Sequence, residues 1–351
     1  MTFTLLFIVC SIVLSFISFD FLIKRSRLNQ LKKNNDKGER WATQRKPIIG
    51  GIGFFCVFIF SVLFYPIFIS HKGYLDIGYW TLILICSLGF FSGLWDDLKG
   101  STPRVKLLIQ ILIGIIIIAT GNGISAFNSN WINYPMTLFW SVSLMNSINM
   151  LDNMDAITAS VSGVIIASLI AIGFYDIGRL SFYTFTSIGI FISLIVFLKW
   201  NWNPSKMYMG DNGSQFLGAF LAFVGIKVLW NNRISNIFEF PIQEIIAVAL
   251  SFIAMISDTA TVTINRLRAG KSPFIGGKDH TTHHFSYLGL SDRKIALTFI
   301  AISIIANGLA FYVICIDKNL TIYKSILWLI VIFSIFAGLY STTIFAKQKK
   351  Q

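Results

Sequence analysis

The chain has 351 residues, of which 55% are hydrophobic and only 13% are charged. A soluble globular domain carries about twice that fraction of charged residues, and the apolar residues here come in long blocks, so the composition excludes an ordinary soluble protein. The net charge of +13 would suit a nucleic-acid-binding protein, but the cations lie between apolar blocks, which is typical of a membrane protein.

We predict an all-α, polytopic integral membrane protein of about eleven transmembrane helices, because roughly twenty apolar residues cross a bilayer as a helix. The whole chain, residues 1–351, is expected to form a single domain. The first segment is too long, and its start too poor in positive charge, for a cleaved signal peptide. In chain order the helices are expected at 2–23, 48–70, 76–94, 105–121, 131–149, 156–175, 181–199, 213–230, 240–263, 293–316 and 325–346.

The positive charges predict the orientation of these segments. Lysine and arginine gather on the cytoplasmic side of a membrane protein. If the eleven segments alternate, one side of the membrane receives 23 of the 29 lysines and arginines. This arrangement places the N-terminus outside and the C-terminus in the cytoplasm. It also places the loops 24–47, 95–105, 150–155, 200–212 and 264–292 together on the cytoplasmic face.

Carboxylates and histidines lie in the same cytoplasmic loops. A single loop of this kind is most simply a solvated one, but polar side chains in four such loops on one membrane face favour a functional site. These are Asp96 and Asp97 after the third segment, Asp152 and Asp155 after the fifth, Asp211 after the seventh, and His280, His283 and His284, three of the four histidines, after the ninth.

The residue types indicate a metal and phosphate site. Aspartates near asparagines are hard oxygen ligands suited to Mg²⁺, with Mn²⁺ as a second choice. Three histidines could indicate zinc, but no cysteine accompanies them. Lysine, arginine and histidine beside a hard cation indicate bound phosphate. The glycines of "GDNGS" allow a close approach of the backbone before an apolar helix, whose N-terminus attracts anions. Such a site suits a phosphorylated soluble substrate that meets a lipid.

Five motifs, in order along nearly the whole chain, resemble the polyprenyl-phosphate N-acetylhexosamine-1-phosphate transferase family (glycosyltransferase family 4). They are "RKPIIGGIGF", "WDD", "NSINMLDNMD", "MGDNGS" and "SDTATVTINRLRAGKSPFIGGKDHTTHH". Where the family commonly has Asp-Gly-x-Asp-Gly, this chain has Asn153 and Ala156 in the glycine positions, so the turn is expected to be less permissive of positive φ. The family commonly has His-x-His-His, so only His283 and His284 carry over directly.

The resemblance implies an activity. The enzyme would be a Mg²⁺-dependent phosphotransferase that moves a hexosamine 1-phosphate, expected to be N-acetylated, from a UDP-sugar to undecaprenyl phosphate. UMP leaves, and the lipid-diphosphate-sugar begins the synthesis of a cell-surface polysaccharide such as lipopolysaccharide, or of a cell-wall glycan. The expected location is the bacterial cytoplasmic (inner) membrane, with the active site on the cytoplasmic face, a homodimer as one arrangement and no nucleic-acid partner.

The resemblance also implies roles for individual residues. Asp96 and Asp97 could orient or deprotonate the lipid phosphate or bind a second metal, and these alternatives stay open. Simpler interpretations are helix-end capping for Asn146 and Asn149, and membrane anchoring for Lys106. The implied sets are the metal ligand Asp211, the catalytic residues Asp96, Asp97 and Asp152, and the substrate-binding residues Lys106, Asn146, Asn149, Arg266, His283 and His284.

Two other classes of function remain as alternatives. A secondary transporter of an anionic solute would place its site near the bilayer midplane on broken helices, often within inverted repeats, whereas the charged groups here lie at one face. A non-catalytic membrane scaffold would need no set of carboxylates.

Overall fold

The structure is a computed structural model that describes residues 2–30, 46–68, 76–177, 180–232, 240–272, 277–317 and 320–346. Within these ranges the chain is helical, and one isolated parallel bridge joins Ile48 to Tyr208, so the predicted all-α class is confirmed. Most of the predicted loop 24–47, at residues 31–45, lies outside the described residues, and so do the lysines after residue 346.

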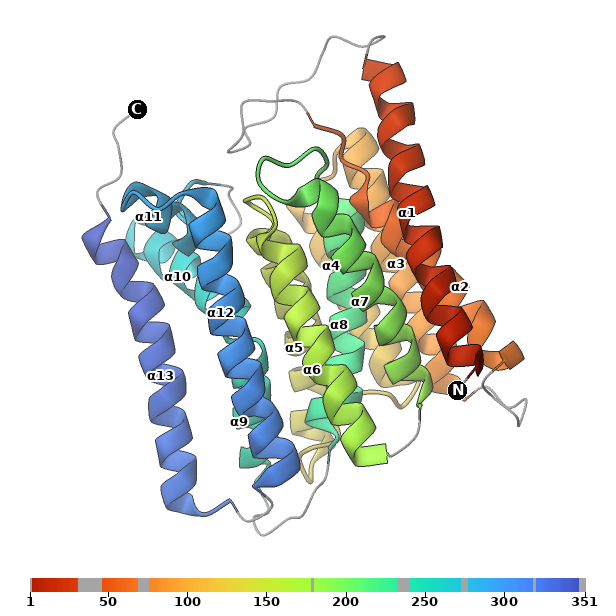
Figure 1. The fold of residues 1–351 in the computed structure, drawn as a ribbon. Coiled ribbons are helices and arrows are strands. Elements are labelled where there is room, and N and C mark those ends of the chain that lie inside the picture. The colour runs from red at the N-terminus through yellow and green to blue at the C-terminus, as the bar shows by residue number, and fades with distance from the viewer. Residues whose placement is uncertain are drawn as a thin grey trace.

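Every predicted apolar segment contains a helix (Figure 1). Two of the helices, α8 and α12, end in a turn of π-helix. In chain order the elements are α1 (Thr2–Gln30), α2 (Gly50–Phe68), α3 (Ile77–Lys99), α4 (Pro103–Ala119), α5 (Asn130–Leu151), α6 (Ile157–Ile177), α7 (Phe182–Asn201), α8 (Asp211–Gly225) with η1 (Ile226–Trp230), α9 (Ile242–Ser251), α10 (Ile253–Arg268), α11 (Thr281–Tyr287), α12 (Asp292–Phe311) with η2 (Tyr312–Ile316), and α13 (Ile322–Phe345).

Eight helices of the described chain are long and apolar enough to cross a membrane, and the pair α9–α10 makes a ninth if it counts as one crossing. Of the eleven predicted segments, α4 has only 17 residues and α5 carries several polar side chains. The structure therefore supports a polytopic membrane protein, while the number eleven and the orientation stay predictions.

The ninth predicted segment, 240–263, is wrong as a single straight helix. The chain breaks at Phe252, whose φ of −106° and ψ of 13° are not helical, and α9 and α10 meet at a bend of 79°. A physical reason is that α10 is rich in polar residues. Burying it in hydrocarbon along the membrane normal would therefore contribute little favourable free energy. The predicted loop 264–292 that follows contains the short helix α11.

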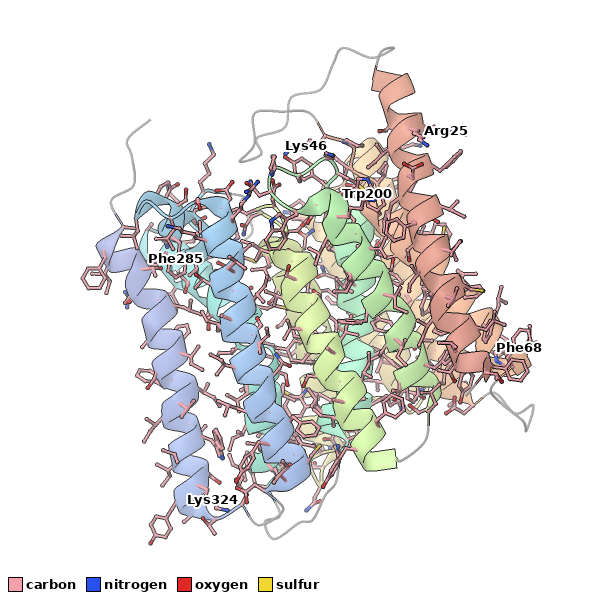
Figure 2. The ribbon with its side chains drawn as sticks, viewed as in Figure 1. Arg25, Lys46, Phe68, Trp200, Phe285 and Lys324 are labelled. Atoms are coloured by element: carbon pink, nitrogen blue, oxygen red, sulfur yellow. The ribbon has the colours of Figure 1, made fainter. Side chains whose placement is uncertain are left out.

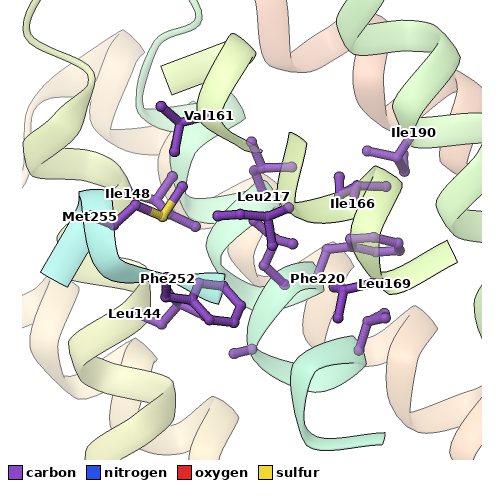
Figure 3. Packing of buried hydrophobic residues seen from close by; sticks show 14 of the residues in the cluster. Leu144, Ile148, Val161, Ile166, Leu169, Ile190, Leu217, Phe220, Phe252 and Met255 are labelled. Carbon is purple, nitrogen blue, oxygen red and sulfur yellow. The ribbon is translucent and has the colours of Figure 1, made fainter. Parts of the chain in front are cut away.

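Helix α8 is the centre of the molecule. All its residues from Asn212 to Gly225 are buried, and it packs against α2, α3 and α5. Figure 3 shows part of this core, in which Leu217 and Phe220 lie among Ile148, Ile166 and Phe252. Helix α13 lies at the edge of the bundle and exposes most of its apolar side chains, as expected for a helix that faces lipid.

The connections that carry the predicted site gather at one end of the bundle, here called the site end. Lys46, Trp200 and Phe285 are all at this end, whereas Phe68 and Lys324 are at the other (Figure 2). The start of α2, the end of α7 and helix α11 therefore lie at the same end of the bundle although they are far apart in sequence.

Candidate active site

Asp211 is the first residue of the central helix α8. Gly210, the residue before it, makes the turn that leads into this helix. Gly210 has a φ of +82°, which favours glycine, and a Cβ at this position would lie 2.4 Å from the Ile48 side chain and 2.9 Å from an Asp97 oxygen. The glycine therefore lets the chain turn tightly into α8 while α2 and α3 stay close.

Asp97 holds the N-terminus of α8. Its Oδ1 accepts the backbone N–H of Asp211 at 3.1 Å, and its Oδ2 accepts the backbone N–H and the side-chain amide of Asn212 at 2.8 and 2.6 Å. The first N–H groups of a helix have no partner within the helix, and a carboxylate also interacts favourably with the helix dipole. Asp97 is thus a capping residue contributed by another helix.

Asp96, the residue before Asp97, contacts a different partner, Lys106. The Lys106 ammonium lies 2.6 Å from Asp96 Oδ2 and 2.6 Å from Asp211 Oδ2, and the three side chains are between 12 and 27% exposed. Asn149 donates to Asp211 Oδ1 at 2.7 Å and to Ser214 at 2.8 Å. Two carboxylates thus share one lysine, and Asn149 orients the Asp211 carboxylate.

A layer of amides lies one helical turn deeper than these charges. Gln110 donates to Gln215 at 3.2 Å and to Asn146 at 3.3 Å, and Asn146 donates back to Gln110 at 2.9 Å. Gln110 follows Lys106 by one turn and Gln215 follows Asp211 by one turn. The sequence analysis missed both glutamines, although their spacing from the charged residues was a usable signal.

The segment before α2 runs alongside the segment before α8. Tyr208 N–H donates to Pro47, Gly50 N–H to Tyr208, and Gly51 N–H to Met209, at 2.9 to 3.1 Å. A Cβ on Gly51 would lie 2.0 Å from the Asn212 side chain, so only glycine allows this approach. The proline and double glycine of the first motif therefore position the start of α8.

Asp155 organises the loop between α7 and α8. Its carboxylate accepts from Ser205 N–H and Oγ at 3.0 and 2.7 Å and from Asn203 at 3.2 Å. Lys46 lies 3.8 Å from the same carboxylate and donates to Ser205 at 2.9 Å. Asp155 is buried, and its contacts are those of a loop anchor. Both Asp152 and Asp155 line the cavity described below.

The turn after Asp155 keeps a positive φ without glycine. Ala156 has a φ of +66°, and its N–H donates to Asn201 Oδ1 at 3.0 Å. The expectation that this turn avoids positive φ was therefore wrong, because the hydrogen bond and the buried packing around Ala156 impose the conformation at a cost of about 1–2 kcal/mol.

Ala156→Gly is expected to stabilise the protein by about 1 kcal/mol, since glycine adopts a positive φ without this cost. The thermal midpoint of the purified protein in one detergent measures the change. Ala159→Gly, at an equally buried position inside α6, is the control and should destabilise by a similar amount. A lower midpoint for Ala156→Gly would contradict the strain at this turn.

The histidines and Arg266 lie around α10 and α11. Arg266 donates to Asp279 through Nε and Nη2 at 2.8 and 2.7 Å, and although burial opposes it, this pair lowers the pKa of Asp279. Burial and the nearby His280 lower the pKa of His283 to about 3, and burial lowers the pKa of His284. His283 is therefore neutral near pH 7 and can donate one N–H to a phosphate but adds no charge.

A single cavity of about 1690 Å³ joins these groups. Its polar wall includes seven of the predicted site residues. Asp96, Asp97 and His284 are not in the lining, and Asp96 contacts the lining residue Lys106. The predicted site residues in the wall are Lys106, Asn146, Asn149, Asp152, Asp211, Arg266 and His283, joined by Lys46, Asn153, Asp155, Asn203, Lys278, His280 and Asp292.

The other wall of the cavity is apolar, and on this side the cavity opens outward from the bundle. Phe139 is 68% and Ile256 is 38% exposed, so this wall continues to the surface that α5 and α10 present to the surroundings. The apolar lining comprises Leu107, Phe139, Val142, Leu144, Ile256, Ala260 and Ile264.

The carboxylates fit a magnesium ion that also binds a substrate. Mg²⁺ is usually held by one or two carboxylates, with water and phosphate oxygens completing the octahedron. The described residues contain no group of three or more His, Cys, Asp or Glu side chains placed for one metal. Asp96 and Asp211 are such a pair of carboxylates, and a cation, the Lys106 ammonium, already lies between them.

Comparisons with known proteins support the family resemblance. The sequence profile of glycosyl transferase family 4 matches residues 79–229, which carry Asp96, Asp152 and Asp211. The chain is 28% identical to a probable undecaprenyl-phosphate N-acetylglucosaminyl 1-phosphate transferase of Bacillus subtilis (strain 168), over 82% of this chain and 78% of that protein. It is 26% identical to the phospho-N-acetylmuramoyl-pentapeptide-transferase of Staphylococcus aureus (strain MSSA476), over 86% of this chain and 97% of that protein. The matched region and the two relatives support the resemblance of this chain to the polyprenyl-phosphate sugar-1-phosphate transferases of glycosyl transferase family 4.

Proposed function

We propose that the protein transfers an N-acetylhexosamine 1-phosphate from a UDP-sugar to undecaprenyl phosphate, with release of UMP, at a Mg²⁺-dependent site on the cytoplasmic face of the bacterial inner membrane. The observation that carries the proposal is the single cavity, in which a carboxylate–lysine cluster, an arginine–histidine wall and an apolar wall meet. The B. subtilis relative, whose name gives undecaprenyl phosphate and N-acetylglucosamine, supplies the choice of lipid and sugar.

The apolar wall supports a lipid substrate. A polyprenyl chain lying along Phe139, Val142 and Ile256 would enter from the membrane and leave its phosphate beside Lys106. Burying hydrocarbon against these side chains is favourable by about 25 cal/mol for each Å². A site for two soluble substrates would need no such wall.

The polar wall supports transfer between two anionic partners. Asp96 and Asp211 would hold Mg²⁺, which neutralises the diphosphate and stabilises the negative charge of the transition state. Lys106 lies where it can draw the lipid phosphate toward the diphosphate, and Asp96, which contacts Lys106, would act on that phosphate through Lys106 or the metal. Asn149 keeps the Asp211 carboxylate in one orientation, and the Arg266–His283 side faces the rest of the nucleotide sugar.

The cation distribution supports the cytoplasmic orientation, since 23 of the 29 lysines and arginines fall on the side of the site loops. The anionic-solute transporter is the weaker alternative. One half of the broken pair α9–α10 does line the cavity, but Lys46, which lines the same cavity, lies at the site end of the bundle (Figure 2) and not in its middle.

One assay tests the activity and the orientation. Radiolabelled UDP-N-acetylglucosamine and Mg²⁺ are added to sealed vesicles that contain the protein and undecaprenyl phosphate, prepared inside-out and right-side-out. A UDP-sugar does not cross a bilayer, so inside-out vesicles should yield lipid-linked label and UMP, and right-side-out vesicles should do so only after detergent opens them.

Each alternative has its own result in this assay. Product in sealed right-side-out vesicles alone would reverse the orientation and leave the activity. Uptake of label without lipid-linked product would indicate a transporter. A panel of other UDP-sugars, compared by kcat/KM, identifies the hexosamine.

A further inference from the structure

Asn153 and Thr282 connect two segments that lie 129 positions apart in the sequence. Asn153 lies in the loop between α5 and α6, Thr282 is the second residue of α11, and Thr282 Oγ1 donates to Asn153 Oδ1 at 2.7 Å. Asn153 Nδ2 donates to the carbonyl oxygen of Met150 at 2.9 Å. Both ends of this side-chain amide therefore have partners, and its orientation is fixed.

This contact lies beside cavity residues from both segments. Asp152 and Asn153 line the cavity from the loop, and His283, which follows Thr282, lines it from α11. Helix α11 has only seven residues, and a helix of that length is not stable by itself in water, so its position depends on contacts with other elements. The Asn153–Thr282 hydrogen bond therefore contributes to the separation between Asp152 and His283.

The same contact joins the two places where the sequence departs from the family pattern. Asn153 stands where the family commonly has glycine, and Thr282 lies within His-x-x-His-His, which is one residue longer than the family's His-x-His-His. Glycine has no side chain and could not accept this hydrogen bond. The asparagine thus supplies an anchor for a helix whose start differs from the family pattern.

We propose that Asn153 and Thr282 are a positioning pair for the sugar-nucleotide donor, whose hydrogen bond holds Asp152 and His283 at the separation that this donor needs. The inference rests on the proposed function for the identity of the donor as a UDP-sugar. The lipid would lie along the apolar wall, which α4, α5 and α10 build. Loss of the hydrogen bond should therefore weaken the use of the donor and leave the use of the lipid unchanged.

Thr282→Val is the variant that tests the pair. Thr282 is 0% exposed and does not line the cavity, so its hydroxyl can influence the donor only through the residues that it contacts. Valine keeps the shape of threonine and removes the hydroxyl, so the KM for the UDP-sugar should rise about tenfold, the effect of one lost hydrogen bond. The kcat and the KM for undecaprenyl phosphate should stay within about twofold of the parent, because the bond contacts no reacting atom. Thr282→Ser keeps the hydroxyl and should restore the KM.

Asn153→Ala removes the acceptor of the same hydrogen bond and shows whether the two residues act together. It should also raise the KM for the UDP-sugar, and the double variant should show no further rise, whereas two independent effects would multiply. Titration calorimetry of the UDP-sugar with Mg²⁺, in the absence of undecaprenyl phosphate, gives its dissociation constant without turnover and should show the same changes.

Thr81→Val is the matched control. Asn122 Nδ2 donates to Thr81 Oγ1 at 3.1 Å in the buried interior, so this is a second asparagine–threonine hydrogen bond between two segments, and neither residue lines the cavity. Thr81→Val should lower the thermal midpoint in detergent by about as much as Thr282→Val does, but the dissociation constant of the UDP-sugar should not change.

The inference and the proposed function can fail separately. An unchanged KM in Thr282→Val, a KM that Thr282→Ser does not restore, a multiplied effect in the double variant, or an equal change in Thr81→Val would overturn the positioning pair while transfer activity stood. A parent that binds the UDP-sugar without transferring the sugar phosphate, and whose binding Thr282→Val weakens, would overturn the transferase and leave the pair supported.

Discussion

Asp211→Asn is expected to lower kcat by about 10³-fold, because several kcal/mol of transition-state stabilisation depend on the metal charge that this carboxylate would hold. Asparagine keeps the size of the side chain but removes the charge between Lys106 and Asn149. The measurement is turnover of radiolabelled UDP-N-acetylglucosamine over a range of Mg²⁺ concentrations.

The control for this prediction is Asp317→Asn, since Asp317 meets Lys324 at the 2.6 Å that separates Asp211 from Lys106. It should lose stability but keep turnover. Near-normal turnover of Asp211→Asn at low Mg²⁺ would remove Asp211 from the metal site. Equal losses of turnover in both variants would mean that the effect comes from folding.

The neighbouring carboxylates Asp96 and Asp97 are expected to give opposite results. Asp97→Ala leaves three donors at the start of the buried α8 without their acceptor, so the free energy of unfolding should fall by about 3 kcal/mol. Asp96→Asn breaks one contact to Lys106, which keeps Asp211 as its partner. Its stability should therefore stay close to that of the parent, while kcat falls by about 10²-fold.

Thermal midpoints and kcat of the two variants, measured in the same detergent, check this division. If Asp97→Ala were as stable as the parent, Asp97 could not be the cap of α8. If Asp96→Asn kept its kcat, the catalytic group would have to be sought at Asp152, which also lines the cavity.

The sequence by itself determined the class of the fold and most of the polar residues that line the cavity. Blocks of about twenty apolar residues can satisfy their backbone groups in lipid only as helices, so a helix forms in every predicted segment. The polar residues between those blocks were the only candidates for chemistry, and Lys106, Asn149, Asp152, Asp211, Arg266 and His283 do line one cavity. The order of the five motifs was enough to indicate the family that the chain resembles.

The tertiary structure decided which partner each of these side chains contacts. Asp96 and Asp97 are alike in sequence, but neighbours on a helix project about 100° apart, and only the packing of α3 against α8 turns one to Lys106 and the other to a helix end. In the sequence, Asn149 was a candidate for helix capping or substrate binding. The position of α5 lets its side chain donate a hydrogen bond to Asp211.

The bend at Phe252 was also missed from the sequence, although the polar residues of α10 that follow it were a usable signal. That bend brings α10 to the cavity, where Asp258 meets His280 across 22 positions of the chain. Periodicity and composition report what each segment buries, whereas a contact between distant segments depends on how the helices pack, which local patterns do not specify.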